Sequence, residues 1–218
     1  MIKHTLPSNQ QAAEAAATYL SQKVGHNTNL FFSGGSSADV LAALNSVLSD
    51  EQKKGVQLFM VDERYGDKGH ESSNEHVLGF DVDAYAGVSL VLREGLSLEQ
   101  TADEYAAIVE KAFDDGQSTN IAILGIGSDD HIAGIKPMTS VQYKAIFSGS
   151  LAVGYDWDDF QRITITERAL IHMQHAVVFA GASKAEAVGR IDSSVAEHIQ
   201  PSSILTRMPD VQIYNVNS

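Results

Sequence analysis

Hydrophobic and polar positions along the chain follow two periods that alternate from the N-terminus to the C-terminus. Apolar residues at helical spacing predict helices over about 9–24, where Ser8 is an N-cap, over 37–48, from Ser97 to Ala112, and over 183–199. Nearly continuous apolar runs are typical of parallel strands that are buried on both faces. Such runs, with one β-branched stretch at 162–166, predict strands at 29–32, 56–62, 88–92, 120–127, 162–166, 176–181 and 211–216.

Strands that alternate with helices predict an α/β fold. Repeated βαβ units form a mainly parallel, Rossmann-like sheet with helices on both faces. The chain shows no repeat or linker, so we expect one α/β domain over residues 1–218. A polar loop is expected from Glu63 to about Glu71. Because ligands of such sheets bind beyond the carboxyl ends of the strands, the residues that follow each strand are the candidates for function.

Composition narrows the classes of function. The chain of 218 residues contains no cysteine, which excludes disulfides, thiolate metal sites and a cysteine nucleophile. The formal net charge is −13, and no basic stripe is present, so we expect no nucleic-acid partner. An anionic ligand would require the few cations to converge on its site. No apolar run is long enough for a membrane span or a secretory signal, so we expect no membrane association and a cytoplasmic protein.

Four predicted strands are followed by polar clusters: "SGGSS" (33–37), "DER" (62–64), "GIGSDDHIAG" (125–134) and "GASK" (181–184). In the first cluster, glycines allow close backbone approach and positive φ, and the helix that follows offers unpaired N–H groups. This combination favours binding of an anion, most often phosphate. Neither G-x-x-x-x-G-K nor G-x-G-x-x-G is present at this corner, so we expect a small phosphorylated metabolite as the ligand.

Several motifs, in this order, resemble one known family. They are "FFSGGSSADVL", "MVDERYG" with "SSN" behind it, "ILGIGSDDHIAGIKP", "RITIT" and "GASKAEAV", and they cover about 29–190. They resemble the 6-phosphogluconolactonase family, within the wider group that includes glucosamine-6-phosphate deaminase. The resemblance implies hydrolysis of 6-phosphoglucono-δ-lactone in the pentose phosphate pathway, with no metal and no organic cofactor.

The resemblance also implies roles for individual positions. His131 matches the family's general base, and Asp62 and Arg64 fall in an acidic-arginine motif at the mouth of the site, where Asp62 is a further catalytic candidate. The sugar phosphate would be held by a glycine- and serine-rich corner and two cations: Ser33, Gly34, Gly35, Ser36, Ser37, Arg162 and Lys184.

The chemistry is compatible with these residue types. A neutral imidazole can accept a proton from water near pH 7, which typically contributes about 10²–10⁴-fold to a rate. Asp129 lies two residues before His131 and could fix its tautomer. The alternative is that Asp129 only bonds loop N–H groups in an Asx turn.

The sequence departs from the family pattern and leaves two other functions open. Asp130 stands where the family usually has glycine, and this places an extra negative charge near an anionic substrate. A glucosamine-6-phosphate deaminase or isomerase is one alternative, because "HIA" (131–133) echoes that branch. However, Lys136 occupies the position of the branch's assisting glutamate. A non-catalytic sugar-phosphate-binding protein is the other alternative.

Overall fold

The computed structural model describes residues 1–191 and 194–216 and contains a seven-stranded sheet, in which every neighbouring pair is parallel. Its order is β1-β10-β9-β6-β2-β3-β5. The predicted fold class is therefore confirmed. The strands are β1 (Ile2–Leu6), β2 (Thr28–Phe32), β3 (Val56–Met60), β5 (Gly87–Ser89), β6 (Thr119–Gly125), β9 (His175–Ala180) and β10 (Val211–Val216).

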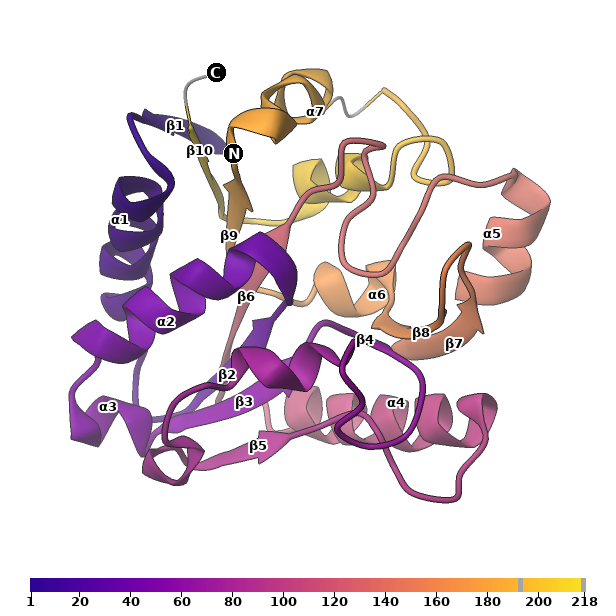
Figure 1. Cartoon of the computed structure of the whole chain (residues 1–218), viewed down its shortest axis with the longest axis horizontal. Coiled ribbons are helices and arrows are strands. Elements are labelled where there is room, and N and C mark those ends of the chain that lie inside the picture. Colours follow the sequence, from indigo (N-terminus) through magenta and orange to yellow (C-terminus); the bar gives the residue numbers. More distant parts are fainter. Residues whose placement is uncertain (192–193, 217–218) are drawn as a thin grey trace.

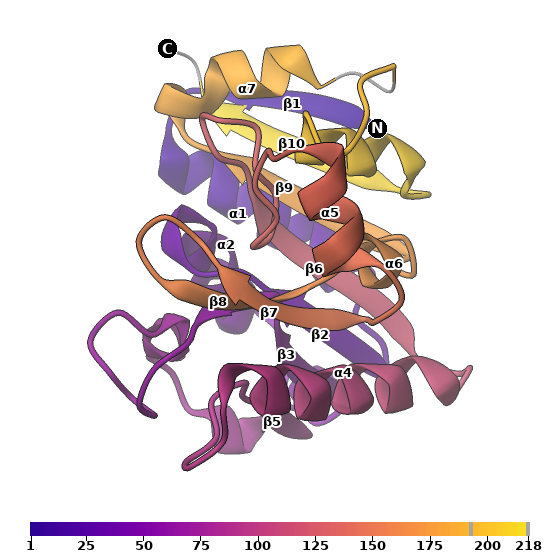
Figure 2. The same ribbon diagram turned by 90° about the vertical axis from the view of Figure 1, so that its right-hand side faces the viewer.

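Helices cover both faces of this sheet, with α1 and α2 on one side and α4 and α6 on the other (Figure 1, Figure 2). The α-helices are α1 (Asn9–Ser21), α2 (Ala38–Val47), α3 (Asp50–Lys53), α4 (Leu98–Asp114), α5 (Ser140–Phe147), α6 (Glu167–Leu170) and α7 (Ala185–Arg190). Short 3-10 helices are η1 (Gly35–Ser37), η2 (Asn74–Val77), η3 (Val82–Ala84), η4 (Ala182–Lys184) and η5 (Pro201–Arg207). Across residues 1–191 and 194–216, no helix is both long and apolar enough to cross a bilayer.

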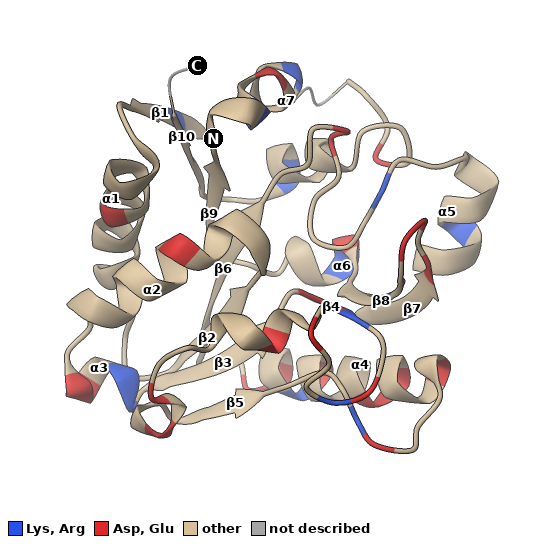
Figure 3. Ribbon diagram, in the orientation of Figure 1, with Lys and Arg blue, Asp and Glu red and all other residues tan. Residues whose placement is uncertain are grey.

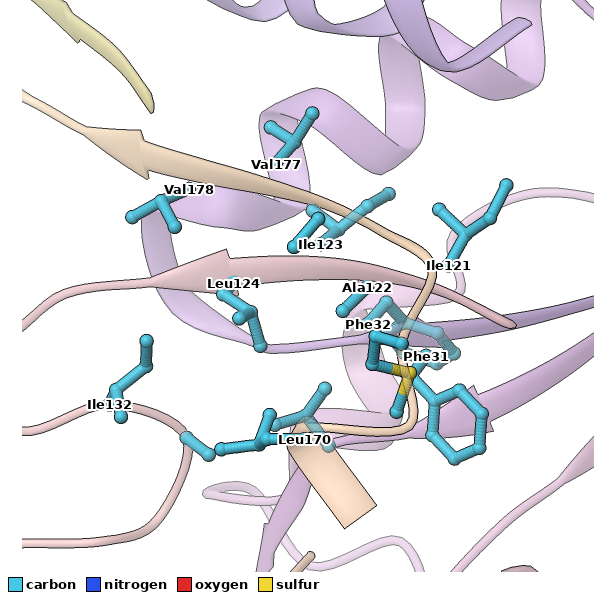
Figure 4. Packing of buried hydrophobic residues seen from close by; sticks show 14 of the residues in the cluster. Phe31, Phe32, Ile121, Ala122, Ile123, Leu124, Ile132, Leu170, Val177 and Val178 are labelled. Carbon is cyan, nitrogen blue, oxygen red and sulfur yellow. The ribbon is translucent and has the colours of Figure 1, made fainter. Parts of the chain in front are cut away.

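The core explains why the central strands read as continuous apolar runs. Every residue of β2 is buried, and Phe31 stacks on Phe59 of β3 with 4.7 Å between ring centroids. On the same side, Phe113 of α4 lies 5.6 Å from Phe31. Figure 4 shows side chains of β6 and β9 packed with those of β2, and Ile132 and Leu170 at the edge of this cluster. Burial on both faces removes the alternation that an exposed strand would show.

A second, antiparallel sheet of β4 (Asp62–Arg64), β8 (Gln161–Ile165) and β7 (Ala152–Asp156) packs beside the first. The predicted strand 56–62 is therefore wrong at its end, because β3 stops at Met60 and the chain changes sheets at Val61. The N–H of Val61 donates to Phe32 O at 2.8 Å, and its carbonyl accepts from Ile165 N at 2.9 Å. Glu63 and Arg64 thus belong to β4 and not to a polar loop.

Other predicted boundaries also needed correction. The strand expected at 88–92 is Gly87–Ser89, and among the described residues of 183–199 the expected helix is α-helical only in α7. Ile191 leaves the helical conformation with ψ 113°, and Gln200 Nε2 donates to Arg190 O at 2.7 Å, which satisfies a carbonyl at the helix end. Positions 192–193 of that prediction lie outside the described residues. Among the strands and α-helices, β1, α3, α5, α6 and β7 have no counterpart in the sequence prediction.

Candidate functional site

A cavity of about 180 Å³ opens beyond the carboxyl ends of β2 and β6. Nine of the eleven predicted site residues line it, and Ser37 and Asp129 do not. The remaining lining residues are Asn74, Gly125, Ile126, Gly127 and Ala133. The fold therefore brings together the four polar clusters that are far apart in the sequence.

The corner between β2 and α2 is shaped by its two glycines. Gly35 has φ +63°, a left-handed conformation that glycine adopts without strain. At Gly34, a Cβ atom would lie 2.2 Å from Asn74 Oδ1, so only glycine leaves room for that amide. No side chain caps the start of η1 or α2, and Ser33 Oγ is buried without a hydrogen-bond partner. The corner thus offers donors to a ligand in the cavity.

Ser37 lies beneath this corner and does not face the cavity. Its side chain is fully buried, and Oγ donates to Gly34 O at 2.8 Å and lies 3.2 Å from Ser33 O. The hydroxyl of Ser37 stabilises the shape of the corner. It does not reach the cavity, so it is not placed to contact a ligand there.

Two arginines face each other across β4 and β8. Arg64 and Arg162 are directly paired in the antiparallel register, and both line the cavity. Like charges at such positions destabilise a sheet unless an anion neutralises them. The Nε atoms of both side chains are buried and have no hydrogen-bond partner. Both guanidinium groups therefore contribute positive charge to the lining of the cavity.

Neighbours fix Arg162 from two sides. Its guanidinium carbon lies 4.4 Å from the ring centroid of Trp157, and Nη2 lies 3.1 and 3.2 Å from the two carboxylate oxygens of Asp159. Asp62 Oδ2 is 3.8 Å from Nη1. Burial raises the pKa of Asp62, while the charges of Arg162 and Arg64 act in the opposite direction.

Asn74 is a cavity residue to which the sequence assigned no role, although it ends the "SSN" segment. Its position depends on Glu63, which is fully buried. Glu63 Oε1 accepts from Asn74 N at 2.7 Å and from Arg64 N at 2.6 Å, and Oε2 accepts from Ser73 Oγ at 2.8 Å. Burial raises the pKa of Glu63, and these hydrogen bonds oppose that change. The carboxyl group thus ties the 73–74 segment to β4.

His131 and Asp129 form a hydrogen-bonded pair at the edge of the cavity. The Nδ1 atom of His131 lies 2.6 Å from Asp129 Oδ1, and this bond lowers the pKa of Asp129 to about 2. A carboxylate at this distance favours the proton on Nδ1, which leaves Nε2 as an acceptor. Gly127 makes room for the pair, because a Cβ there would lie 2.1 Å from the same Nδ1 atom.

Positively charged side chains gather at this cavity, although the chain as a whole carries a net negative charge. Asp and Glu are spread over most of the ribbon (Figure 3), yet Arg64, Arg162 and Lys184 all line the cavity. Lys184 ends η4, the short helix that follows β9. Within the part of the chain that the structure describes, no group of three or more His, Asp or Glu side chains is arranged to hold a metal ion.

Comparison with known families gives a match over nearly the whole chain. Residues 7–213 match the family described as glucosamine-6-phosphate isomerases/6-phosphogluconolactonase. The chain belongs to this family, as its motifs predict. No curated protein matches the sequence significantly.

Solved structures share the fold at low sequence identity. A 6-phosphogluconolactonase from Shewanella baltica OS155 is 16% identical with TM-score 0.82, and the alignment covers 99% of this chain and 97% of that one. A putative 6-phosphogluconolactonase from Neisseria gonorrhoeae FA 1090 is 22% identical with TM-score 0.78 over 100% of both chains. A monomeric glucosamine-6-phosphate deaminase is 18% identical with TM-score 0.79, over 100% of this chain and 97% of that one. These similarities establish the fold. They do not distinguish a lactonase from a deaminase, so the residues of the site must be compared with the needs of each reaction.

Proposed function

We propose that this chain hydrolyses 6-phosphoglucono-δ-lactone to 6-phosphogluconate. The observation that carries the proposal is that an imidazole paired with a carboxylate and a cross-strand pair of arginines share one cavity. The first is suited to activate water, and the second to hold an anionic group of a small phosphorylated substrate.

In this proposal, His131 is the general base. Its Nε2 accepts a proton from water as the water oxygen adds to the lactone carbonyl carbon. Collapse of the tetrahedral intermediate breaks the bond between that carbon and the ring oxygen, and the imidazolium returns the proton to the ring oxygen. Asp129 stabilises the imidazolium and keeps the ring in the required tautomer, since Oδ1 lies 2.6 Å from Nδ1.

The phosphate is assigned to the cationic side of the cavity. Arg64, Arg162 and Lys184 supply positive charge, and the start of η1 with Ser33 supplies donors. Unpartnered donors at a cavity surface gain hydrogen bonds when an anion enters, and such charge-assisted bonds contribute about 1.5–3 kcal/mol each.

A deaminase is the second candidate, because the family and one structural neighbour include that activity. Ring opening, proton transfer between carbons and loss of ammonia call for additional acid–base groups. The position of the deaminase branch's assisting glutamate is Lys136, whose Nζ lies 2.7 Å from Asp158 Oδ1 and 5.6 Å from the Trp157 ring centroid. Lys136 does not line the cavity. This arrangement favours the lactonase.

The direct test of the general base is His131→Ala, assayed by the initial rate of lactone hydrolysis. We expect kcat to fall by about 10²-fold or more in a variant that still unfolds cooperatively on heating. His26→Ala is the matched control, because His26 is exposed and lies outside the cavity. An unchanged rate in folded His131→Ala would remove this residue from the mechanism.

A further inference from the structure

Asp130, the residue beside His131, has an unusual backbone conformation. Its φ is +69°, in the left-handed region where non-glycine residues are uncommon, although aspartate tolerates it better than most. The side chain is only 17% exposed. A carboxylate that is buried to this extent requires a hydrogen-bond partner.

That partner is Arg190, the last residue of α7. Its Nη2 lies 2.9 Å from Asp130 Oδ1, and its Nε lies 3.2 and 3.1 Å from Oδ1 and Oδ2. Nη2 also donates to Ser128 O at 2.7 Å. The guanidinium thus contacts the loop after β6 through both a carboxylate and a carbonyl. The loop and α7 lie side by side in two perpendicular views (Figure 1, Figure 2).

The turn that Arg190 contacts is the one that carries His131. Asp130 N donates to Gly127 O at 3.1 Å, and Gly127 N donates to His131 O at 2.9 Å. The carbonyl of Asp130 accepts from Ser202 N at 2.9 Å. Displacement of Asp130 would therefore displace the backbone of both Gly127 and His131.

Arg190 also lies on the segment that follows Lys184, one of the cations that line the cavity. The helix α7 begins at Ala185, directly after Lys184. A guanidinium at the end of α7 therefore joins the segment that carries one cavity cation to the turn that carries the imidazole. It also neutralises Asp130, which would otherwise repel an anionic ligand.

We propose that Asp130 and Arg190 are positioning residues, which hold the His131 turn at a fixed place relative to Lys184. The kinetic consequence rests on the proposed function, because it concerns a base and a phosphate contact that act on one substrate. The structural consequence does not rest on it. Misplacement of a reacting group by about 1 Å can reduce a rate by up to about 10²-fold.

The test is a double-mutant cycle of Arg190→Ala and Asp130→Gly. Arg190→Ala leaves Asp130 with a positive φ and no cation, so we expect kcat for lactone hydrolysis to fall about tenfold. Glycine at 130 adopts the turn without strain and leaves Arg190 only its contact with Ser128 O, so Arg190→Ala should have a much smaller effect in the Asp130→Gly background than in wild type. Additive effects of the two substitutions would overturn the proposal.

A second measurement is independent of the reaction. Amide hydrogen exchange of residues 127–131 should become faster in Arg190→Ala, and also in Arg190→Lys, which keeps the charge but cannot form the two-pronged contact. Glu186→Ala is the control, because Glu186 is the other carboxylate near Arg190 (Oε2 to Nη1 3.8 Å) and is exposed. Unchanged exchange in both Arg190 variants would overturn the proposal. If the wild-type chain does not hydrolyse the lactone, the exchange result still decides the role of the pair.

Discussion

Asp129 Oδ1 lies 2.6 Å from His131 Nδ1, although the two residues are separated by only one position. The sequence left open whether Asp129 fixes the imidazole or bonds loop N–H groups. The side-chain bond is the shorter contact, since Asp129 Oδ1 lies 3.4 Å from His131 N. The ring is thus oriented within its own turn.

The first prediction concerns the removal of this orientation. Asp129→Asn keeps the shape of the side chain but cannot stabilise an imidazolium, so kcat should fall. The loss should be smaller than that of His131→Ala, which removes the whole general-base contribution of about 10²–10⁴-fold. Equal rates in Asp129→Asn and wild type would show that the contact does not contribute to turnover.

The same substitution should alter the dependence of stability on pH. The pKa of Asp129 is about 2 in the folded chain and about 3.9 in an unfolded chain. Because the folded value is the lower one, the carboxylate stabilises the fold above about pH 4, and this contribution is lost as the pH falls toward 2. The difference in urea midpoint between wild type and Asp129→Asn should shrink as the pH falls from about 4 toward 2. A difference that stays constant in acid would contradict this account.

The second prediction concerns recognition of the phosphate by Lys184. Lys184→Ala should raise KM for 6-phosphoglucono-δ-lactone by about 10- to 100-fold, as expected for loss of a charge-assisted contact. It should change KM for unphosphorylated glucono-δ-lactone little. Lys144→Ala, an exposed change on α5, is the control. If Lys184→Ala affects both lactones equally, Lys184 does not read the phosphate.

The third prediction concerns Asp159, whose two carboxylate oxygens accept hydrogen bonds from Arg162 Nη2 at 3.1 and 3.2 Å. An incoming phosphate must compete with this carboxylate. Asp159→Asn should therefore lower KM for the phosphorylated lactone, by up to about fivefold because exposed ion pairs contribute only about 0–1 kcal/mol. Asp158→Asn is the control, since Asp158 pairs with Lys136. A rise in KM for Asp159→Asn would indicate that Asp159 positions Arg162 for binding.

The loops at the carboxyl ends of the main-sheet strands could be predicted from the sequence, because each loop follows an apolar run that is buried on both faces. Ser33–Ser36, His131 and Lys184 all lie after such runs, and parallel strands bring their carboxyl ends to one edge. Most of the motifs that resemble the family lie in the same loops.

The second sheet could not be predicted in this way. The strand β4 has three residues, all of them charged, so no period distinguishes it from a loop. The pairing of Arg64 with Arg162 depends on a register between distant segments. Likewise, nothing local indicates that Asp130 pairs with Arg190, sixty positions away along the chain. Such contacts are set by tertiary packing.

The central claim is that this site hydrolyses a phosphorylated lactone and does not release ammonia from an amino sugar. The most direct measurement follows both reactions on one preparation of the wild-type chain, with chelator present. We predict hydrolysis of 6-phosphoglucono-δ-lactone well above its spontaneous rate and no ammonia from glucosamine 6-phosphate. Ammonia release without lactone hydrolysis would contradict the claim and assign the chain to the deaminase branch of its family.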